Sequence, residues 1–361
     1  MRPESLITKV QGEQVRVAPA GGFEVKSLIR FKNLILLIFS IFVLVIFPLK
    51  ASSYYLTLIS TAFLWSYLSI CWNLVGGYGG LFSFGHSAFF AIGAYTSTLL
   101  YMKLGVSPWF GMVLGSILSG IFSLLISIVI LRYGIKGIYF ALTTLAFSEV
   151  LRNLLDNWKF VGSSEGLLLP LVNSPANFLF TERVYYYYVG LSLVLFGIAV
   201  TYIIQRSKIG YYTIAIREDD LAAEVSGVPT SKYKALIMIT SALMTALGGT
   251  FYAQLFLYIS PEVVAGWEPQ LQMIIGTMVG GPGTIFGPVI GSTSFTVLVE
   301  VLEALPFGQL KETAAIFQRI LWGITLVVVL LYQPGGMIKF IGVVQKRWLV
   351  IKAGLSQKFR K

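Results

Sequence analysis

The chain has 361 residues, of which 56% are apolar and only 12% are charged, and its mean hydropathy is +0.79. Soluble domains are usually about 45–50% apolar and about 25% charged, so this composition excludes an ordinary water-soluble enzyme. A single Cys and a single His, Cys71 and His86, exclude a structural disulfide, a Cys/His zinc site and a Cys–His catalytic pair with an orienting group. The sequence therefore predicts a membrane protein with no catalytic residues and no metal site.

A polar tail, residues 1–33, opens the chain. No small-residue cleavage site follows the first apolar run, so we expect no signal peptide. Apolar runs long enough to cross or partly cross a bilayer then follow one another, which predicts an all-α polytopic protein with about ten transmembrane segments. They lie near 34–49, 54–75, 86–102, 108–131, 138–151, 185–204, 235–259, 270–282, 284–303 and 316–332.

The formal net charge is +11, and most of the 27 Lys and Arg residues lie in 1–33, 205–234 and 333–361. These segments flank apolar runs, so membrane topology explains them better than nucleic-acid binding does. The positive-inside rule places all three segments, and hence both termini, in the cytoplasm at the plasma (inner) membrane. Segment 152–184 then becomes the largest external loop, either a plain connector or a surface for an external partner.

Two glycine clusters interrupt apolar segments, one within 72–97 and one within 279–291. Both begin with the letters VGG and continue with a glycine and a phenylalanine at matching positions. Paired interruptions of this kind indicate a translocation path between two structural halves, with chance convergence of packing motifs as the alternative. The candidate path residues are Gly76, Gly77, Gly79, Gly80, Ser83, His86, Gly280, Gly281 and Gly283.

His86 follows the first cluster, beside serine residues. It is either a substrate or gating contact or a hydrogen-bonded residue at a helix start. Glu149 and Arg152 are three residues apart on one helix, which predicts a structural ion pair. No carboxylate is evident at the middle of a segment, where ion-coupled carriers often have one.

Segment 205–234 predicts a short cytoplasmic helix at 218–227. Three acids at 218–220 would begin it, alanines would continue it, and Gly227 and Pro229 would end it. On these residues alone the helix either transmits force from a partner or is an ordinary amphipathic connector.

At this point the sequence resembles a known family, the LivM-type permease subunits of ABC importers for branched-chain amino acids and related substrates. Four segments carry the resemblance in the family's order, and LWGITLVVVLLYQPGGM (321–337) resembles its closing helix. Coverage runs from about residue 55 to 337. The four segments are WNLVGGYGGLFSFGHSAFFAIGAY (72–95), GIYFALTTLAFSEVLR (137–152), KIGYYTIAIREDDLAAEVSGVPTSKYK (208–234) and MVGGPGTIFGPVIG (278–291).

The resemblance implies that 218–227 is the helix that docks into a groove on a cytoplasmic ATPase. In the general pattern Glu-Ala-Ala, three residues, Gly, this chain supplies Ala222, Ala223 and Gly227, but Leu221 replaces the Glu. Asp220 or Glu224 would then serve as the acid. The resemblance also implies a homologous second permease, two ATP-binding subunits and an external solute-binding protein as partners.

The chain contains no GxxxxGK[ST] phosphate loop, so ATP is expected to be used by the partners and no cofactor by this chain. We therefore expect a permease domain at 34–332 that imports hydrophobic amino acids and is not itself an enzyme. The alternatives are import of urea or short amides, an ion-coupled secondary carrier, and a membrane scaffold without a substrate. Uptake in ATP-free vesicles separates the carrier from the ABC importer.

Overall fold

The computed structural model describes residues 46–170, 175–303, 320, 323–324, 327 and 336–337. The chain divides into two units, Met1–Ala51 and Ser52–Lys361. In the first unit residues 46–51 are described, and they contain the 3-10 helix η1 (Phe47–Leu49). The second unit is mainly α-helical, which confirms the predicted fold class at that level.

The elements of the second unit follow the predicted segments closely in its first half. They are α2 (Ser53–Asn73), the π turn η2 (Leu74–Tyr78), α3 (His86–Leu104), α4 (Pro108–Arg132), α5 (Ile138–Asn157), η3 (Lys159–Val161), η4 (Ser163–Glu165), β1 (Leu167–Leu168), η5 (Pro175–Asn177), α6 (Arg183–Arg206), α7 (Lys208–Glu218), α8 (Asp220–Val225), α9 (Thr230–Phe256), β2 (Tyr258–Ile259), α10 (Pro261–Ala265), α11 (Trp267–Gly280) and α12 (Gly287–Glu303).

Five helical segments among the described residues are long and apolar enough to cross a membrane. They are Ser53–Tyr78, Pro108–Ile130, Ile138–Asn157, Arg183–Arg206 and Thr230–Phe256. The predicted segments 86–102, 270–282 and 284–303 are helical, but α11 has 14 residues and α12 has 17, short of the roughly 20 that a full crossing takes. The predicted segments 34–49 and 316–332 lie largely outside the described residues, so the predicted count of ten is not confirmed.

Helix α5 continues six residues into the predicted loop 152–184. The predicted Glu149–Arg152 ion pair is present, with Arg152 Nη2 2.8 Å from Glu149 Oε2. Arg152 Nη1 also lies 3.7 Å from Asp156 Oδ2 on the next turn, and 3.2 Å from Glu262 Oε2 on α10. These contacts along one helix face stabilise an extra turn that apolar periodicity does not reveal.

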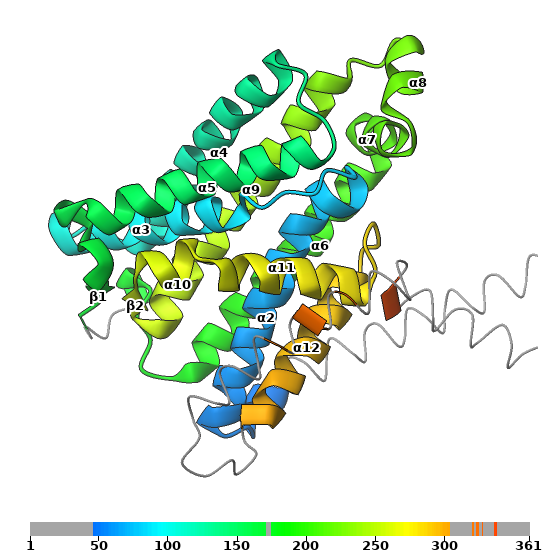
Figure 1. Cartoon of the computed structure of the whole chain (residues 1–361). Helices are drawn as coiled ribbons and strands as arrows, with labels where there is room; N and C mark the ends of the chain where they lie inside the picture. Colours follow the sequence, from blue (N-terminus) through cyan, green and yellow to red (C-terminus); the bar gives the residue numbers. More distant parts are fainter. Residues whose placement is uncertain are drawn as a thin grey trace, which may run out of the picture. The chain divides into compact units, whose positions relative to one another are not determined.

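The helices form two groups that meet at α2 and α9. Helix α9 packs against α3 and α4, while α2 packs against α6, α11 and α12, and α2 also contacts α9. Figure 1 shows α7 and α8 at one end of this unit and β1, β2 and α10 at the other. The interrupted segments therefore lie between the two groups, close to the end that carries α7 and α8.

Helix α4 buries several serines, while many of its isoleucine and leucine side chains are exposed. Ser119 and Ser123 are fully buried, whereas Ile121 is 50% exposed and Leu125 is 55% exposed. The Ser119 hydroxyl donates to Ala242 O on α9 at 3.0 Å. Water would disfavour this arrangement, but a lipid bilayer solvates the outward Ile and Leu side chains, so the arrangement indicates a membrane helix.

Helices α3 and α9 approach each other closely because glycines lie at their contact. A Cβ added to Gly93 would collide with Ala246 O, and one added to Gly249 would collide with Phe90 O. Small residues at such positions allow membrane helices to pack backbone to backbone. The hydroxyl of Thr250 also donates to Gly93 O at 3.1 Å, which links the two helices by a hydrogen bond.

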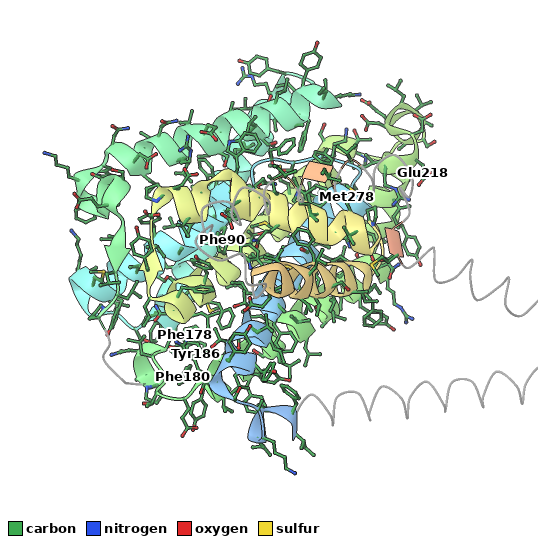
Figure 2. All side chains as sticks on the ribbon, turned by 60° about the horizontal axis from the view of Figure 1, so that its bottom comes forward. Phe90, Phe178, Phe180, Tyr186, Glu218 and Met278 are labelled. Atoms are coloured by element: carbon green, nitrogen blue, oxygen red, sulfur yellow. The ribbon has the colours of Figure 1, made fainter. Side chains whose placement is uncertain are left out.

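A two-stranded ribbon and an aromatic cluster hold the end opposite α8. Strand β1 pairs antiparallel with β2, Leu167 opposite Ile259. The rings of Trp109 and Phe178 stack with centroids 4.0 Å apart, and Phe178 also contacts Phe180. Figure 2 shows Phe178 and Phe180 gathered with Tyr186 at the start of α6. These contacts fix the connection between α5 and α6 against the bundle.

Replacing Gly249 with Val should lower the free energy of unfolding by about 1–3 kcal/mol, because added side-chain volume forces α3 and α9 apart. The Ala146→Val variant is the control, since Ala146 is exposed on α5. Thermal unfolding of both variants in detergent measures the effect. Equal unfolding midpoints for the two variants would contradict the close α3–α9 contact.

Candidate functional site

The two glycine clusters expected from the sequence lie side by side. The first break runs from the end of α2 through the π turn η2 to the start of α3, and the second separates α11 from α12. The side chain of Asn73 joins them: its Nδ2 donates to Thr284 O at 2.9 Å, and its Oδ1 accepts from Gly283 N at 2.8 Å. One amide at the end of α2, beside the first break, thus replaces helical partners that the interrupted backbone of the second break lacks.

Glycine is needed where the breaks touch. A Cβ at Gly77 would collide with Asn73 Oδ1 and with Gly283 N. Gly80 and Gly283 adopt left-handed φ angles of +64° and +73°, a region that other L residues rarely occupy. Among the other predicted path residues, Gly76 and Gly280 pack within their own breaks, and a Cβ there would meet the Trp72 ring or the Gly287 carbonyl group. Gly79 would meet Val75 O, and Gly281 has φ +128°.

His86 is fully buried and hydrogen-bonded through both ring nitrogens. Its Nε2 lies 2.8 Å from Ser241 Oγ, and its Nδ1 lies 3.2 Å from Ser83 Oγ. The Ser241 hydroxyl donates to Cys71 O at 2.6 Å, so Nε2 of the ring carries the proton donated to Ser241. The imidazole therefore links α2, the first break, α3 and α9 from inside the bundle.

Further side chains satisfy the backbone of the loop between η2 and α3. Both Trp72 Nε1 and Gln270 Nε2 donate to Ser83 O, at 2.9 and 3.1 Å. Thr144 Oγ1 accepts from Phe84 N at 3.0 Å. The roles of these side chains and of Asn73 were not predicted from the sequence. The feature that could have indicated them is a polar residue inside or directly beside an otherwise apolar run. The first break is thus held by α2, α5 and α11 together.

The predicted cytoplasmic helix is present as α8, and a longer helix that the sequence did not reveal, α7, precedes it. Asp219 caps the start of α8, since its Oδ1 accepts from Leu221 N at 2.9 Å and from Ala222 N at 3.0 Å. Gly227, with φ +85°, ends the helix, and the next N–H, of Val228, donates to Ala223 O at 3.0 Å. Asp219 and Gly227 thus mark the two ends as predicted, but the helix is shorter than the predicted 218–227, because Glu218 is the last residue of α7.

Helix α8 has one side packed against the protein and one side exposed. Ala223 is buried against the protein, while Leu221 is 66% exposed and Val225 is 90% exposed. Ala222, Glu224 and Gly227 are exposed as well. Figure 1 shows α8 at the edge of the unit, beyond α7. The helix thus exposes two apolar side chains and one acid at its surface.

Asp220 points away from that exposed side. Its Oδ2 lies 2.8 Å from Lys234 Nζ at the start of α9 and 3.1 Å from Lys136 Nζ in the α4–α5 connection. Burial alone raises the pKa of Asp220, but the hydrogen bonds to both lysines outweigh it, so the pKa lies below the ordinary value of 3.8. The same hydrogen bond raises the pKa of Lys136. This carboxylate fastens α8 to the bundle.

A cavity of about 230 Å³ separates these two regions. Its walls are the first glycine break, the α4–α5 connection, α7, α8 and the start of α9. The charged and glycine residues that line it are Gly79, Gly80, Lys136, Gly137, Arg217, Asp220 and Lys234. The loop helices and the first break therefore border one common cavity.

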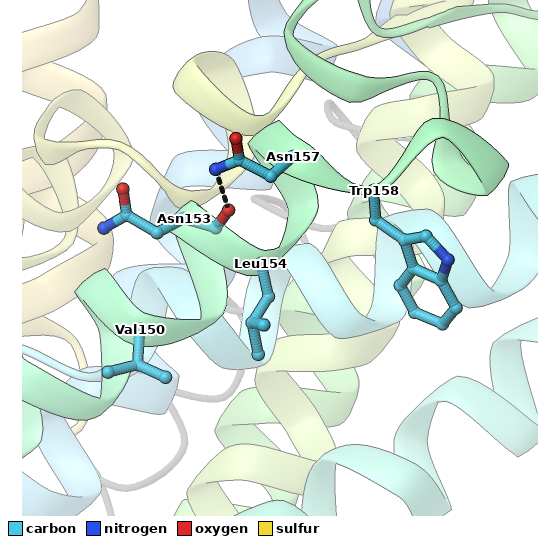
Figure 3. A pocket seen from close by; sticks show the side chains of 5 residues that line it. All are labelled: Val150, Asn153, Leu154, Asn157 and Trp158. Carbon is cyan, nitrogen blue, oxygen red and sulfur yellow. Dashed lines mark hydrogen bonds between the residues drawn. The ribbon is translucent and has the colours of Figure 1, made fainter.

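A second hollow, of about 530 Å³, lies on α5 far along the chain from both glycine breaks. Figure 3 shows its lining, which is apolar apart from the amides of Asn153 and Asn157. Each amide donates to the carbonyl group four residues earlier, both at 2.8 Å. None of the predicted path residues lines it.

Interrupted helices that meet inside a bundle with an apolar exterior define a polytopic helical membrane protein of the permease class. A profile of the family described as the permease component of branched-chain amino acid transport systems matches residues 54–330. The chain belongs to this family.

Curated relatives agree with this assignment. The high-affinity branched-chain amino acid transport system permease protein LivM of Salmonella typhimurium is 26% identical over 290 residues, and so is LivM of Escherichia coli K12. In both cases the match covers 74% of this chain but 65% of the relative's length. The L-arabinose transport system permease protein AraH of Escherichia coli K12 is 25% identical over 230 residues, covering 60% of this chain and 66% of AraH.

Replacing Asp220 with Asn should lower the free energy of unfolding at neutral pH by about 1 kcal/mol, a small value because solvent screens the half-exposed Lys136. The folded-state pKa of Asp220 is depressed, so the stabilisation is complete above pH 3.8 and is lost as the pH falls through the folded pKa. Unfolding midpoints in detergent between pH 7 and pH 3 should therefore converge for the two proteins below pH 3.8. A Glu224→Gln control should match wild type, and a pH-independent Asp220→Asn deficit would contradict the ion pair.

Proposed function

We propose that this chain is a permease subunit of an ATP-driven ABC importer for branched-chain or other hydrophobic amino acids. The observation that carries the proposal is the family match over residues 54–330, together with similarity to LivM over 74% of the chain. The paired breaks and the exposed helix α8 support it, because a permease needs a translocation path and a contact to its energy source. The chain itself is not an enzyme in this scheme.

The proposed assembly contains a homologous second permease, two cytoplasmic ABC ATPases and an external solute-binding protein. Basic residues flank α7 and α8, which supports a cytoplasmic location for this loop and for both termini at the plasma membrane. ATP would be bound by the ATPase subunits. The exposed Leu221 and Val225 would enter an apolar groove on an ATPase, with the exposed Glu224 at its edge.

The proposed transport cycle uses movement of α8. ATP-driven closure of the ATPases would shift α8, and the bundle would alternate its access around the breaks near 76–87 and 280–288. Cores packed by close backbone contact have discrete arrangements, so a small shift at one end can favour a different packing at the other. Asp219 and Gly227 fix the ends of α8, so the helix would move as a single rigid turn.

Introducing a charge at Leu221 or Val225, as Leu221→Glu or Val225→Glu, should reduce ATP-driven leucine uptake at least about tenfold, because a buried unpaired charge costs several kcal/mol. The measurement is uptake of labelled leucine by proteoliposomes that contain the complex co-purified with the full chain. A Ser231→Glu variant, which adds the same charge at an exposed position outside α8, is the control. Unchanged uptake by both α8 variants would refute the docking role, provided that membrane insertion is equal.

A second candidate substrate is a pentose sugar, favoured by the similarity to AraH at 25% identity. The similarity to LivM extends over 74% of this chain and that to AraH over 60%, which favours the amino acid. In the same proteoliposomes leucine should be taken up with ATP, and excess isoleucine should suppress its uptake, whereas L-arabinose and urea should not. ATP-dependent L-arabinose uptake would reverse the substrate assignment, and leucine uptake without ATP would favour a secondary carrier.

A further inference from the structure

Arg217, in the last turn of α7, reaches from the loop helices into the first glycine break. Its Nη1 donates to Gly77 O at 3.0 Å. Its Nε and Nη2 donate to Glu218 Oε1 at 3.2 and 2.6 Å, which orients the planar guanidinium. A carbonyl oxygen at a helix end lacks an N–H four residues further along, so the arginine caps a group that the break leaves open.

The same side chain also lies against the second break. A Cβ added to Gly283 would lie 2.8 Å from Arg217 Nη1. On the first break, a Cβ at Gly80 would lie 2.5 Å from Arg217 Cγ and 3.2 Å from its Cβ. Gly80 and Gly283 both have left-handed φ angles and no side chain, which lets the backbone of each break pass close to the Arg217 side chain.

The ion pairs of Asp220, which also hold this loop, do not involve either glycine break. The carboxylate of Asp220 binds Lys136 and Lys234, which belong to the α4–α5 connection and to α9. Helix α7 contacts the π turn η2 directly, on the side where Arg217 enters it. The cavity of about 230 Å³ beside Arg217 and Gly80 leaves space for the arginine and α8 to shift together.

We propose that Arg217 is a positioning residue that carries movement of α8 to both glycine breaks. The inference rests on the proposed function, in which α8 is moved by an ATPase. Arginine suits this role because its rigid, planar fork donates in several directions at once, here to Gly77 O and to Glu218. Loss of the contacts made by Arg217 would leave ATP hydrolysis intact but would uncouple it from transport through the breaks.

The test compares Arg217→Ala and Arg217→Lys with wild type in the co-purified complex reconstituted into proteoliposomes. Leucine uptake and ATP hydrolysis are measured in the same sample. Arg217→Ala should lower the leucine transported per ATP hydrolysed by at least about fivefold, the loss expected for one charge-assisted hydrogen bond. Arg217→Lys, which keeps the positive charge and one donating nitrogen, should restore part of the ratio.

The matched control is Arg206→Ala, which removes another arginine near α7 whose guanidinium lies 4.3 Å from the Tyr202 ring centroid rather than on a break. It should leave the ratio unchanged. An equal loss of uptake and ATP hydrolysis in Arg217→Ala, with no rescue by Lys, would show a merely structural residue and overturn the inference. The inference would also be overturned if Arg217→Ala took up leucine at the wild-type rate and transported as much leucine per ATP hydrolysed as wild type does.

A second measurement does not depend on transport. Amide hydrogen exchange of the full chain in detergent should become faster at 77–80 and at 281–284 in Arg217→Ala, but not in Arg206→Ala. If exchange at either break were unchanged in Arg217→Ala, the inference that Arg217 acts on both breaks would be overturned, whatever the transport result. A wild-type complex without ATP-driven leucine uptake would instead overturn the proposed function, and this inference with it.

Discussion

The structure depends on hydrogen bonds that replace helical ones where two membrane helices are interrupted. In a bilayer an unpaired backbone group costs several kcal/mol, so an interrupted helix persists only where other groups bind its free backbone atoms. Asn73, at the end of α2 beside the first break, does this for the second break. Trp72 and Gln270 share the carbonyl oxygen of Ser83. The region of the two breaks is therefore held by side-chain to backbone hydrogen bonds that can be exchanged without unfolding a helix.

The same constraint explains the distribution of residues in the bundle. Serines on α4 and glycines on α3 and α9 lie inside, where they allow close approach and short hydrogen bonds, and many isoleucines and leucines of α4 lie outside. Packing of this kind is dense and discrete rather than continuously deformable. In the proposed cycle, a displacement applied at α8 would be transmitted through polar contacts that cross between elements, among them those of Asp220 and Arg217.

Sequence patterns predicted the features that depend on neighbouring residues. The helices near 54–75, 108–131 and 185–204, the two breaks and the ends of α8 follow from apolar runs, glycine clusters and capping residues. Features that depend on distant residues were not predicted, such as the inward turn of Asp220 toward Lys234. The joining of the breaks by Asn73 spans about 210 residues of sequence, and local periodicity contains no information about it.

The most direct test of the account is the composition of the native assembly. The full chain, extracted in mild detergent with a gentle affinity tag, should co-purify with a homologous permease and with P-loop ATPases, identified by mass spectrometry. Addition of ATP to the reconstituted assembly should then drive leucine uptake. Recovery of the chain alone, still able to move leucine in ATP-free vesicles, would contradict the account and make α8 an ordinary connector.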